Sequence, residues 1–238
     1  MNKRKVLVAI IIGLFVGSLA FYTISLLAES RAVDNYNALV EKNSAVERKA
    51  RAITLRGALE IAHVFAKKWS DDAALISLVS ADVDDPDAME VDRTDHRQLG
   101  QDGRRRTWQA VFTSPSLNKR LHLQITDGVI AEALEDGIHD IGVRTLTFTW
   151  ESIIDSPELI KKAKEIEPNL STSVGRGKGY HFIFQTGSYG KPVLTVVGSH
   201  QAGDTQLPAT ITFDQETGQF VESKHYIDNR GVSQWEDF

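Results

Sequence analysis

Hydrophobic residues form one uninterrupted run near the start of the chain, and this run predicts a membrane anchor within residues 1–28. It extends from Val6 to Ala28 without a charged side chain, and its 23 residues exceed the roughly 20 that a helix needs to cross a bilayer. The basic segment Lys3–Lys5 precedes it, so we expect a single pass with the N-terminus in the cytoplasm and all later residues outside the cell. A cleaved signal peptide is the alternative, with a small-residue site at Ser18–Ala20. The apolar core of a signal peptide usually spans only about 7–15 residues, and the observed run is longer.

A polar segment of strong helix formers follows, and we expect a helical juxtamembrane stalk over residues 29–53. Its apolar side chains recur at nearly helical spacing, which would suit a short coiled coil that joins two copies in a homodimer. Asn43 and Glu47 interrupt the spacing, whereas a coiled coil needs about three or four unbroken heptads. The pattern therefore favours a solvated stalk, with a homodimer through the stalk as the alternative.

From residue 54 onward, the order of one helix followed by several strands occurs twice. Apolar spacings of three and four predict helices over 54–68 and 156–166. Alternating apolar residues predict strands over 74–83, 105–113, 120–125, 129–134, 180–185, 191–199, 209–213 and 219–226, and residues 145–150 an extra strand or linker. The predicted fold class is α+β, with two tandem helix-plus-antiparallel-sheet domains, 54–136 and 137–238, that fold separately.

Three short motifs resemble the PepSY family. Thr54–Ala62 and Asp155–Ala163 are similar to the opening helix of PepSY domains, and Asp214–Gln219 is similar to the turn of their last hairpin. With the basic start and the apolar run, the layout resembles small membrane-anchored PepSY proteins of Gram-positive bacteria. The first repeat departs from the family, because its turn is cut to Asp127-Gly128 and an acidic loop follows its first strand. The resemblance implies an extracytoplasmic binding or regulatory module that restrains an envelope peptidase and has no catalytic residues.

The composition of the chain excludes several classes of function and of chemical site. Of the 238 residues, 27 are Lys or Arg and 32 are Asp or Glu, and the net charge of -5 argues against a nucleic-acid partner. The absence of cysteine excludes a thiol nucleophile, a thiolate metal site and a disulfide scaffold. The histidines lack the spacing of a zinc site, and the chain has no Gly-x-Ser-x-Gly segment. We therefore expect no enzymatic activity, no cofactor and no metal site.

Two charged loops extend beyond the shared repeat plan. The acidic loop lacks the ligand and glycine positions of a calcium loop, and Gly175–Gly179 lacks the spacing of a phosphate loop. We expect both to be solvated, and they supply the predicted partner-binding residues Asp84, Asp85, Asp87, Arg176 and Lys178. The alternative is that both are idle insertions, since long loops cost little stability.

The sequence also predicts the surroundings of a short arginine run and of the four tryptophans. Arg104–Arg106 should form no single basic patch, because alternate residues of a strand point to opposite faces. We expect these arginines to pair with nearby acids across strands. Three tryptophans, Trp69, Trp108 and Trp150, are expected in the core, whereas Trp235 in the polar tail is expected to be exposed.

These observations predict a non-enzymatic, membrane-anchored extracytoplasmic module that binds a protein partner in the cell envelope. The PepSY resemblance implies that the partner is an envelope peptidase, which the module restrains. The alternative is a structural scaffold subunit of a secretion or pilus-like assembly. The two differ at the stalk, because an assembly scaffold should dimerise through it, whereas an inhibitor can act as a monomer.

Overall fold

The computed structural model describes residues 52–81, 100–137, 144–172, 179–188, 190–202, 205–229 and 232–237. The expected membrane span at residues 6–28 and all but the last two residues of the expected stalk lie outside these ranges. Within the described ranges, neither helix is long and apolar enough to cross a membrane.

The first half of the described chain is one helix followed by four strands, as the hydrophobic pattern predicts. The helix and strands are α2 (Leu55–Trp69), β1 (Ala74–Ser80), β2 (Thr107–Ser114), β3 (Lys119–Thr126) and β4 (Val129–Gly137). Thr54 caps α2 by accepting a hydrogen bond from the N–H of Gly57. Asp127 and Gly128 join β3 to β4 with φ angles of 55° and 79°, the left-handed backbone that a tight two-residue hairpin turn requires.

The second half repeats this order with additions. Its elements are α4 (Ser156–Ile166), β5 (Leu170–Ser171), β6 (His181–Thr186), β7 (Pro192–Ala202), β8 (Thr205–Asp214), β9 (Phe220–Asn229) and β10 (Val232–Asp237). Asp155 caps α4, and Pro157 lies in its first turn, a position that proline favours. The sequence pattern does not predict β5 or β10, and residues 145–150 form a linker and not a strand.

All these strands belong to one antiparallel sheet, in the order β10-β9-β8-β7-β6-β1-β2-β3-β4, with β5 beside β7. The halves join where β1 pairs with β6, which places Leu78 directly opposite Phe184. The predicted fold class of two tandem helix-plus-sheet domains is therefore wrong. In separate domains, β1 and β6 would each have an unpaired edge, and the pairing of β1 with β6 satisfies both edges at once.

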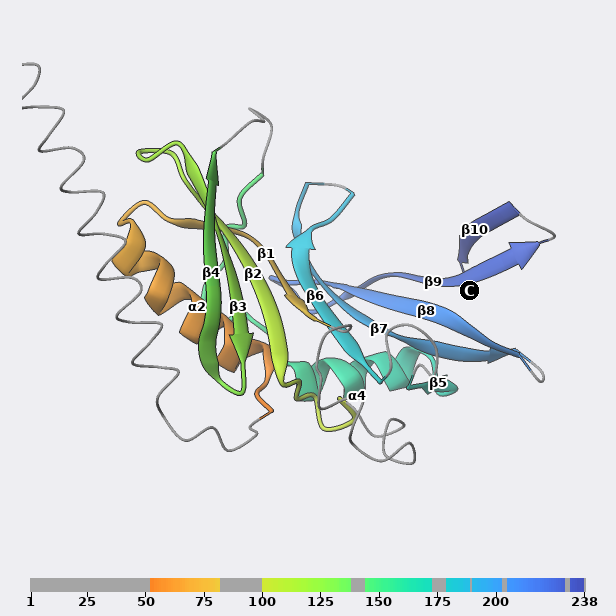
Figure 1. Ribbon diagram of the computed structural model, residues 1–238. Coiled ribbons are helices and arrows are strands. Elements are labelled where there is room, and N and C mark those ends of the chain that lie inside the picture. The colour runs from red at the N-terminus through yellow and green to blue at the C-terminus, as the bar shows by residue number, and fades with distance from the viewer. Residues whose placement is uncertain are drawn as a thin grey trace, which may run out of the picture. The chain divides into compact units, whose positions relative to one another are not determined.

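Both helices pack on the same face of this sheet (Figure 1). α2 contacts β1 to β4, and α4 contacts β7. The covered side chains are almost completely buried, among them Leu78, Trp108, Phe184 and Leu194. Trp108 of β2 stacks on Phe182 of β6 with ring centroids 6.1 Å apart, so the two halves share one hydrophobic core across β1.

Candidate functional site

The face of the sheet turned away from the helices carries a wide hollow over β6 to β9. Its volume is about 600 Å³, and pockets of about 300–1,000 Å³ are the usual size of ligand sites. Four strands and the β6–β7 loop supply its lining: Ile183, Gln185, Thr186, Gly187, Ser188, Lys191, Val193, Thr195, Thr210, Thr212, Asp214, Val221 and Glu222.

Strand register explains why these side chains meet. Thr195 of β7 lies opposite Ile183 of β6 on one side and opposite Thr212 of β8 on the other. Thr212 in turn lies opposite Glu222 of β9. Directly opposed residues of antiparallel strands point to the same face, with Cβ atoms about 4.5–5.5 Å apart. The four side chains therefore form one row across the hollow.

Hydroxyl and apolar groups form the floor of the hollow. The Oγ1 atoms of Thr195 and Thr212 lie 3.1 Å apart and share a hydrogen bond in which either can donate. Thr195 and Thr212 are 8% and 6% exposed, and Val193 beside them is 8% exposed. A hydroxyl has one donor and two acceptor sites, so the pair keeps acceptor capacity for the N–H of a ligand.

Charged side chains at the rim of the hollow are engaged with their neighbours. Lys224 Nζ donates to Glu222 Oε2 at 2.7 Å. The Asp214 carboxylate accepts hydrogen bonds from the N–H of Glu216 and from both the N–H and the hydroxyl of Thr217. The bond from the Thr217 N–H is the main cause that lowers the pKa of Asp214, because it stabilises the ionised carboxylate. Asp214 therefore closes the β8–β9 turn and is ionised at neutral pH.

The chemistry of the lining supports binding and offers no acid–base pair. General acid–base catalysis needs a group whose pKa lies near the working pH and which reaches the substrate. The lining residues include neither histidine nor cysteine, and the two carboxylates among them are held as described above. Within the described ranges, no group of three or more His, Asp or Glu residues is placed to hold a metal ion.

A smaller hollow of about 190 Å³ lies over β2, β3 and β4 of the first half. Its lining includes Gln109, Val111, His122, Gln124, Glu132 and Leu134. Leu134 is 58% exposed, the highest value among the large hydrophobic side chains of the described residues. His122 Nε2 lies 3.2 Å from Asp136 Oδ2, a pair that is ionic only when the histidine is protonated.

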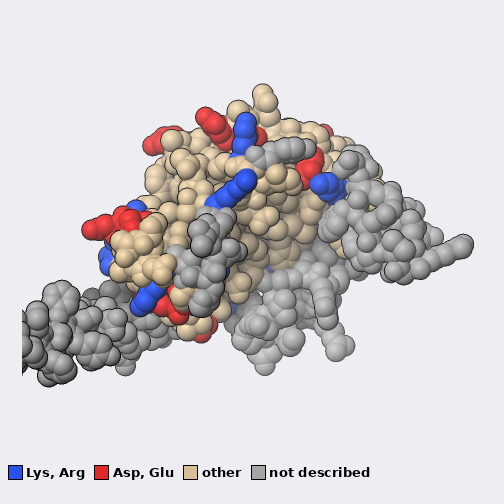
Figure 2. Space-filling view, turned by 90° about the horizontal axis from the view of Figure 1, so that it is seen from above, with Lys and Arg blue, Asp and Glu red and all other residues tan. Residues whose placement is uncertain are grey.

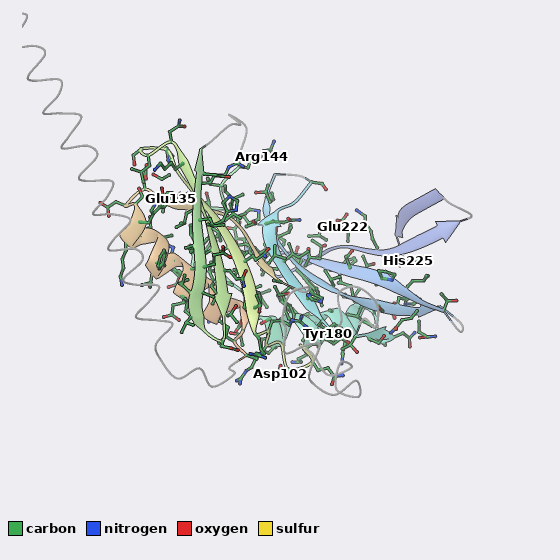
Figure 3. All side chains as sticks on the ribbon, in the orientation of Figure 1. Asp102, Glu135, Arg144, Tyr180, Glu222 and His225 are labelled. Atoms are coloured by element: carbon green, nitrogen blue, oxygen red, sulfur yellow. The ribbon has the colours of Figure 1, made fainter. Side chains whose placement is uncertain are left out.

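The figures place charged side chains relative to the sheet. Glu222 stands on the side of the sheet away from α4, whereas Tyr180 lies near that helix (Figure 3). Lys, Arg, Asp and Glu side chains are scattered among uncharged surface and form no single basic patch in this view (Figure 2).

The five partner-binding residues predicted from the sequence lie outside the described residues. They are Asp84, Asp85, Asp87, Arg176 and Lys178, and none can be placed relative to either hollow. Their proposed role stays a prediction.

The predicted cross-strand pairing of the basic run is confirmed in part, at Arg106. Arg106 forms a bidentate ion pair with Asp127. Its Nε donates to Oδ1 at 2.7 Å and its Nη2 donates to Oδ2 at 2.9 Å. Both side chains are largely buried, at 19% and 7% exposure. Arg104 lies 4.0 Å from Asp102 in an exposed pair. Arg105 is buried and its backbone bridges to that of Ile53.

The tryptophan prediction is confirmed in part. Trp108 is fully buried, but Trp69 and Trp150 are partly exposed because each packs at the border of α2. Trp69 Nε1 donates to Glu135 Oε1 at 2.9 Å, and the rings of Trp150 and His63 form a T-shaped pair with centroids 5.2 Å apart. Partial burial lowers the pKa of His63, with nearby Lys67 as a smaller cause. The side chain of Trp235 lies outside the described residues.

Sequence reasoning missed both hollows. Residues such as Thr195, Thr210 and Thr212 occupy the polar positions of the alternating pattern, which marks them as facing away from the core. The pattern does not say which strands are neighbours, and a row across several strands exists only once the register is known.

Comparison with known proteins finds no family model and no curated protein that matches this chain. The crystal structure of a predicted lipoprotein from Clostridium difficile 630 is similar, with 10% sequence identity and a TM-score of 0.46. The match covers 71% of this chain and 91% of that one. A likeness at this level supports no inference about the function of this chain.

Proposed function

We propose that this chain is a non-enzymatic binding module, held at the outer face of the cell membrane, that captures a segment of a protein partner on the open face of its sheet. The hollow over β6 to β9 is the observation that carries the proposal. It combines a floor of threonine hydroxyls and valine with an exposed Gln185, and its size suits a ligand. Its lining residues offer hydrogen bonds and apolar contact without an acid–base pair.

The proposed location and biological role have their support in the sequence. The uncharged run of residues 6–28, preceded by three basic residues, supports a single membrane pass with the N-terminus in the cytoplasm. The PepSY-like motifs support an envelope peptidase as the partner. The chain would capture a segment of this peptidase and restrain its activity. Each half also has the helix followed by antiparallel strands that this resemblance implies.

Site-specific photocrosslinking in intact cells tests the binding role. A photoreactive amino acid replaces Gln185, which is exposed at the hollow, and in a matched control it replaces Lys161, which is exposed on α4 and faces away from the sheet's open side. We expect a protein adduct from position 185 and none from position 161, and mass spectrometry then identifies the captured segment. Equal adducts from both positions, or adducts from neither, would contradict the proposal.

The identity of the protein in the adduct distinguishes the two roles considered for this chain. A peptidase in the adduct supports restraint of an envelope enzyme. A second copy of the chain, or a subunit of a secretion or pilus-like machine, would support the scaffold role in its place.

A further inference from the structure

The row of side chains that crosses the second-half hollow continues into the first half. Beyond Ile183 of β6, the next opposed residue is Val79 of β1, and the one after it is Gln109 of β2. Gln109 lies opposite Gln124 of β3, and Gln124 lies opposite Glu132 of β4. One row of directly opposed residues therefore runs from Glu132 at one end to Glu222 at the other.

A second row runs beside the first. In the second half, Val193 lies opposite Gln185, and in the first half Val111 lies opposite His122. Ser77 of β1 connects these pairs, because it lies opposite Gln185 on one side and opposite Val111 on the other. Leu134 of β4 and Asp214 of β8 complete the row at its two ends.

Both hollows lie on these two rows, and Val79 and Ser77 connect them at the β1–β6 junction. The first row crosses eight strands. Seven spacings of about 4.8 Å between strands give a length of roughly 34 Å along the sheet. An extended peptide advances about 3.3–3.4 Å per residue, so about ten residues would cover this length.

The chemistry of the rows restricts the occupant. The residues between the two ends are uncharged glutamine, serine, threonine, valine and isoleucine, apart from His122. Such side chains match peptide N–H and C=O groups and small apolar side chains. These two rows contain no long series of basic side chains that could pair with the phosphates of a nucleic acid.

The two ends differ in charge. At the β9 end, Lys191 and Lys224 accompany Asp214 and Glu222, so acids and bases are balanced. At the β4 end, Asp136 lies opposite Arg120, whereas Glu132 lies opposite the neutral Gln124. Glu132 therefore adds a negative charge to the open face close to His122 and the exposed Leu134. This end therefore favours a cationic group on the occupant.

We infer that one extended peptide segment of about ten residues lies across the strands and fills both hollows, with basic residues over β4 and uncharged residues elsewhere. This inference rests on the proposed binding role and extends it, because it makes both halves of the sheet parts of a single site. It also gives the β1–β6 junction a role in recognition, since separate domains would not hold the rows in register.

Fluorescence anisotropy with defined peptides and the full-length chain in detergent micelles tests the inference. The probe is a labelled ten-residue peptide with four Ser-Val repeats followed by two lysines. Its two five-residue halves, one neutral and one ending in the lysines, are measured alongside it. Glu132→Lys reverses the charge at the β4 end, and Gln185→Trp fills the exposed part of the second-half hollow.

We expect each variant to weaken binding of the ten-residue peptide by about tenfold. The neutral half should respond only to Gln185→Trp, and the half with lysines only to Glu132→Lys. The whole peptide should bind more tightly than either half, because occupation of one hollow raises the effective concentration at the other. The control variants Glu151→Lys and Lys161→Trp, both at exposed positions off these rows, should bind like the unmodified chain.

The outcomes separate this inference from the proposed function. If Gln185→Trp weakens binding and Glu132→Lys does not, the second-half hollow binds alone and the spanning segment is wrong. If neither variant affects binding, or if the peptide does not bind, the occupant inferred here is wrong. Concentration-dependent self-association that Glu132→Lys abolishes would show a second copy on this face and would also overturn the inference.

Discussion

The backbone N–H of Leu55, the first residue of α2, donates a hydrogen bond of 2.9 Å to the hydroxyl of Ser156, the first residue of α4. The next N–H of α2, that of Arg56, donates at the same distance to the carboxylate of Asp155, which also caps α4. The hydroxyl of Ser156 itself donates to the carbonyl of Gly103. The first N–H groups of a helix lack partners within the helix. The start of α2 is therefore completed by the start of a helix from the other half.

Replacement of Ser156 by alanine should destabilise the whole molecule. The change leaves the buried N–H of Leu55 without its acceptor, and we expect the free energy of unfolding to fall by about 1–3 kcal/mol. Chemical denaturation of the full chain measures the change. Ser188→Ala, at an exposed position, is the matched control and should stay within about 0.5 kcal/mol of the unmodified chain. Equal stability of the two variants would mean that the shared cap contributes nothing.

The second half should not fold by itself. In a fragment of residues 137–238, β6 loses its partner β1, and Phe182 loses the stacked ring of Trp108. We expect the fragment to lack the cooperative thermal transition that the full chain shows by near-ultraviolet circular dichroism. This outcome is the opposite of what the sequence repeat alone predicts. A sharp transition in the fragment would show that the second half has a sufficient core of its own.

Tyr180 should make stability depend on alkaline pH. Its hydroxyl donates to the carbonyl of Leu170 at 2.8 Å, and burial raises the pKa of Tyr180 to about 12. The ordinary pKa of tyrosine is about 10. Because the fold favours the neutral phenol, its contribution to stability is complete below pH about 10 and is lost as the pH rises towards 12.

Comparison with Tyr180→Phe isolates this effect. At pH 7 the unmodified chain should be more stable by about 1 kcal/mol, the value of one hydrogen bond. The difference between the two chains should shrink as the pH rises above about 10, and urea unfolding at each pH measures it. A difference that stays constant over this range would show that the phenol is accessible to water in the folded state.

Local patterns in the sequence predict most of the elements, and they fail at contacts between distant segments. Thr54 and the Ser156–Pro157 pair mark the starts of both helices, and Asp127-Gly128 marks a hairpin with the positive φ angles that the structure shows. The pairing of β1 with β6 has no such mark, because Leu78 and Phe184 carry only the alternation common to every half-buried strand. The repeat in the sequence therefore predicts two separate cores where the structure has one.

The same reason limits what the sequence shows of the candidate site. Thr195 and Thr212 are recognisable as polar positions of strands, but their contact depends on the register of β7 and β8. Asp214 is recognisable from its turn motif, and its hydrogen bonds to Thr217 confirm that local role. A site made from rows across a sheet is a property of register, which single-strand patterns do not specify.

The pairing of β1 with β6 is the contact on which the single sheet, the shared core and the continuous rows all depend, and a cysteine pair tests it directly. The chain has no cysteine of its own, so Val79→Cys with Ile183→Cys introduces the only two thiols. These positions are directly opposed on the open face, where Cβ atoms lie about 4.5–5.5 Å apart. A short bis-maleimide should join them in the folded full chain, as mass spectrometry of tryptic peptides would show. The control pair Val79→Cys and Thr212→Cys, three strands apart along the same row, should not be joined. Failure to join positions 79 and 183, or equal joining of both pairs, would contradict the account.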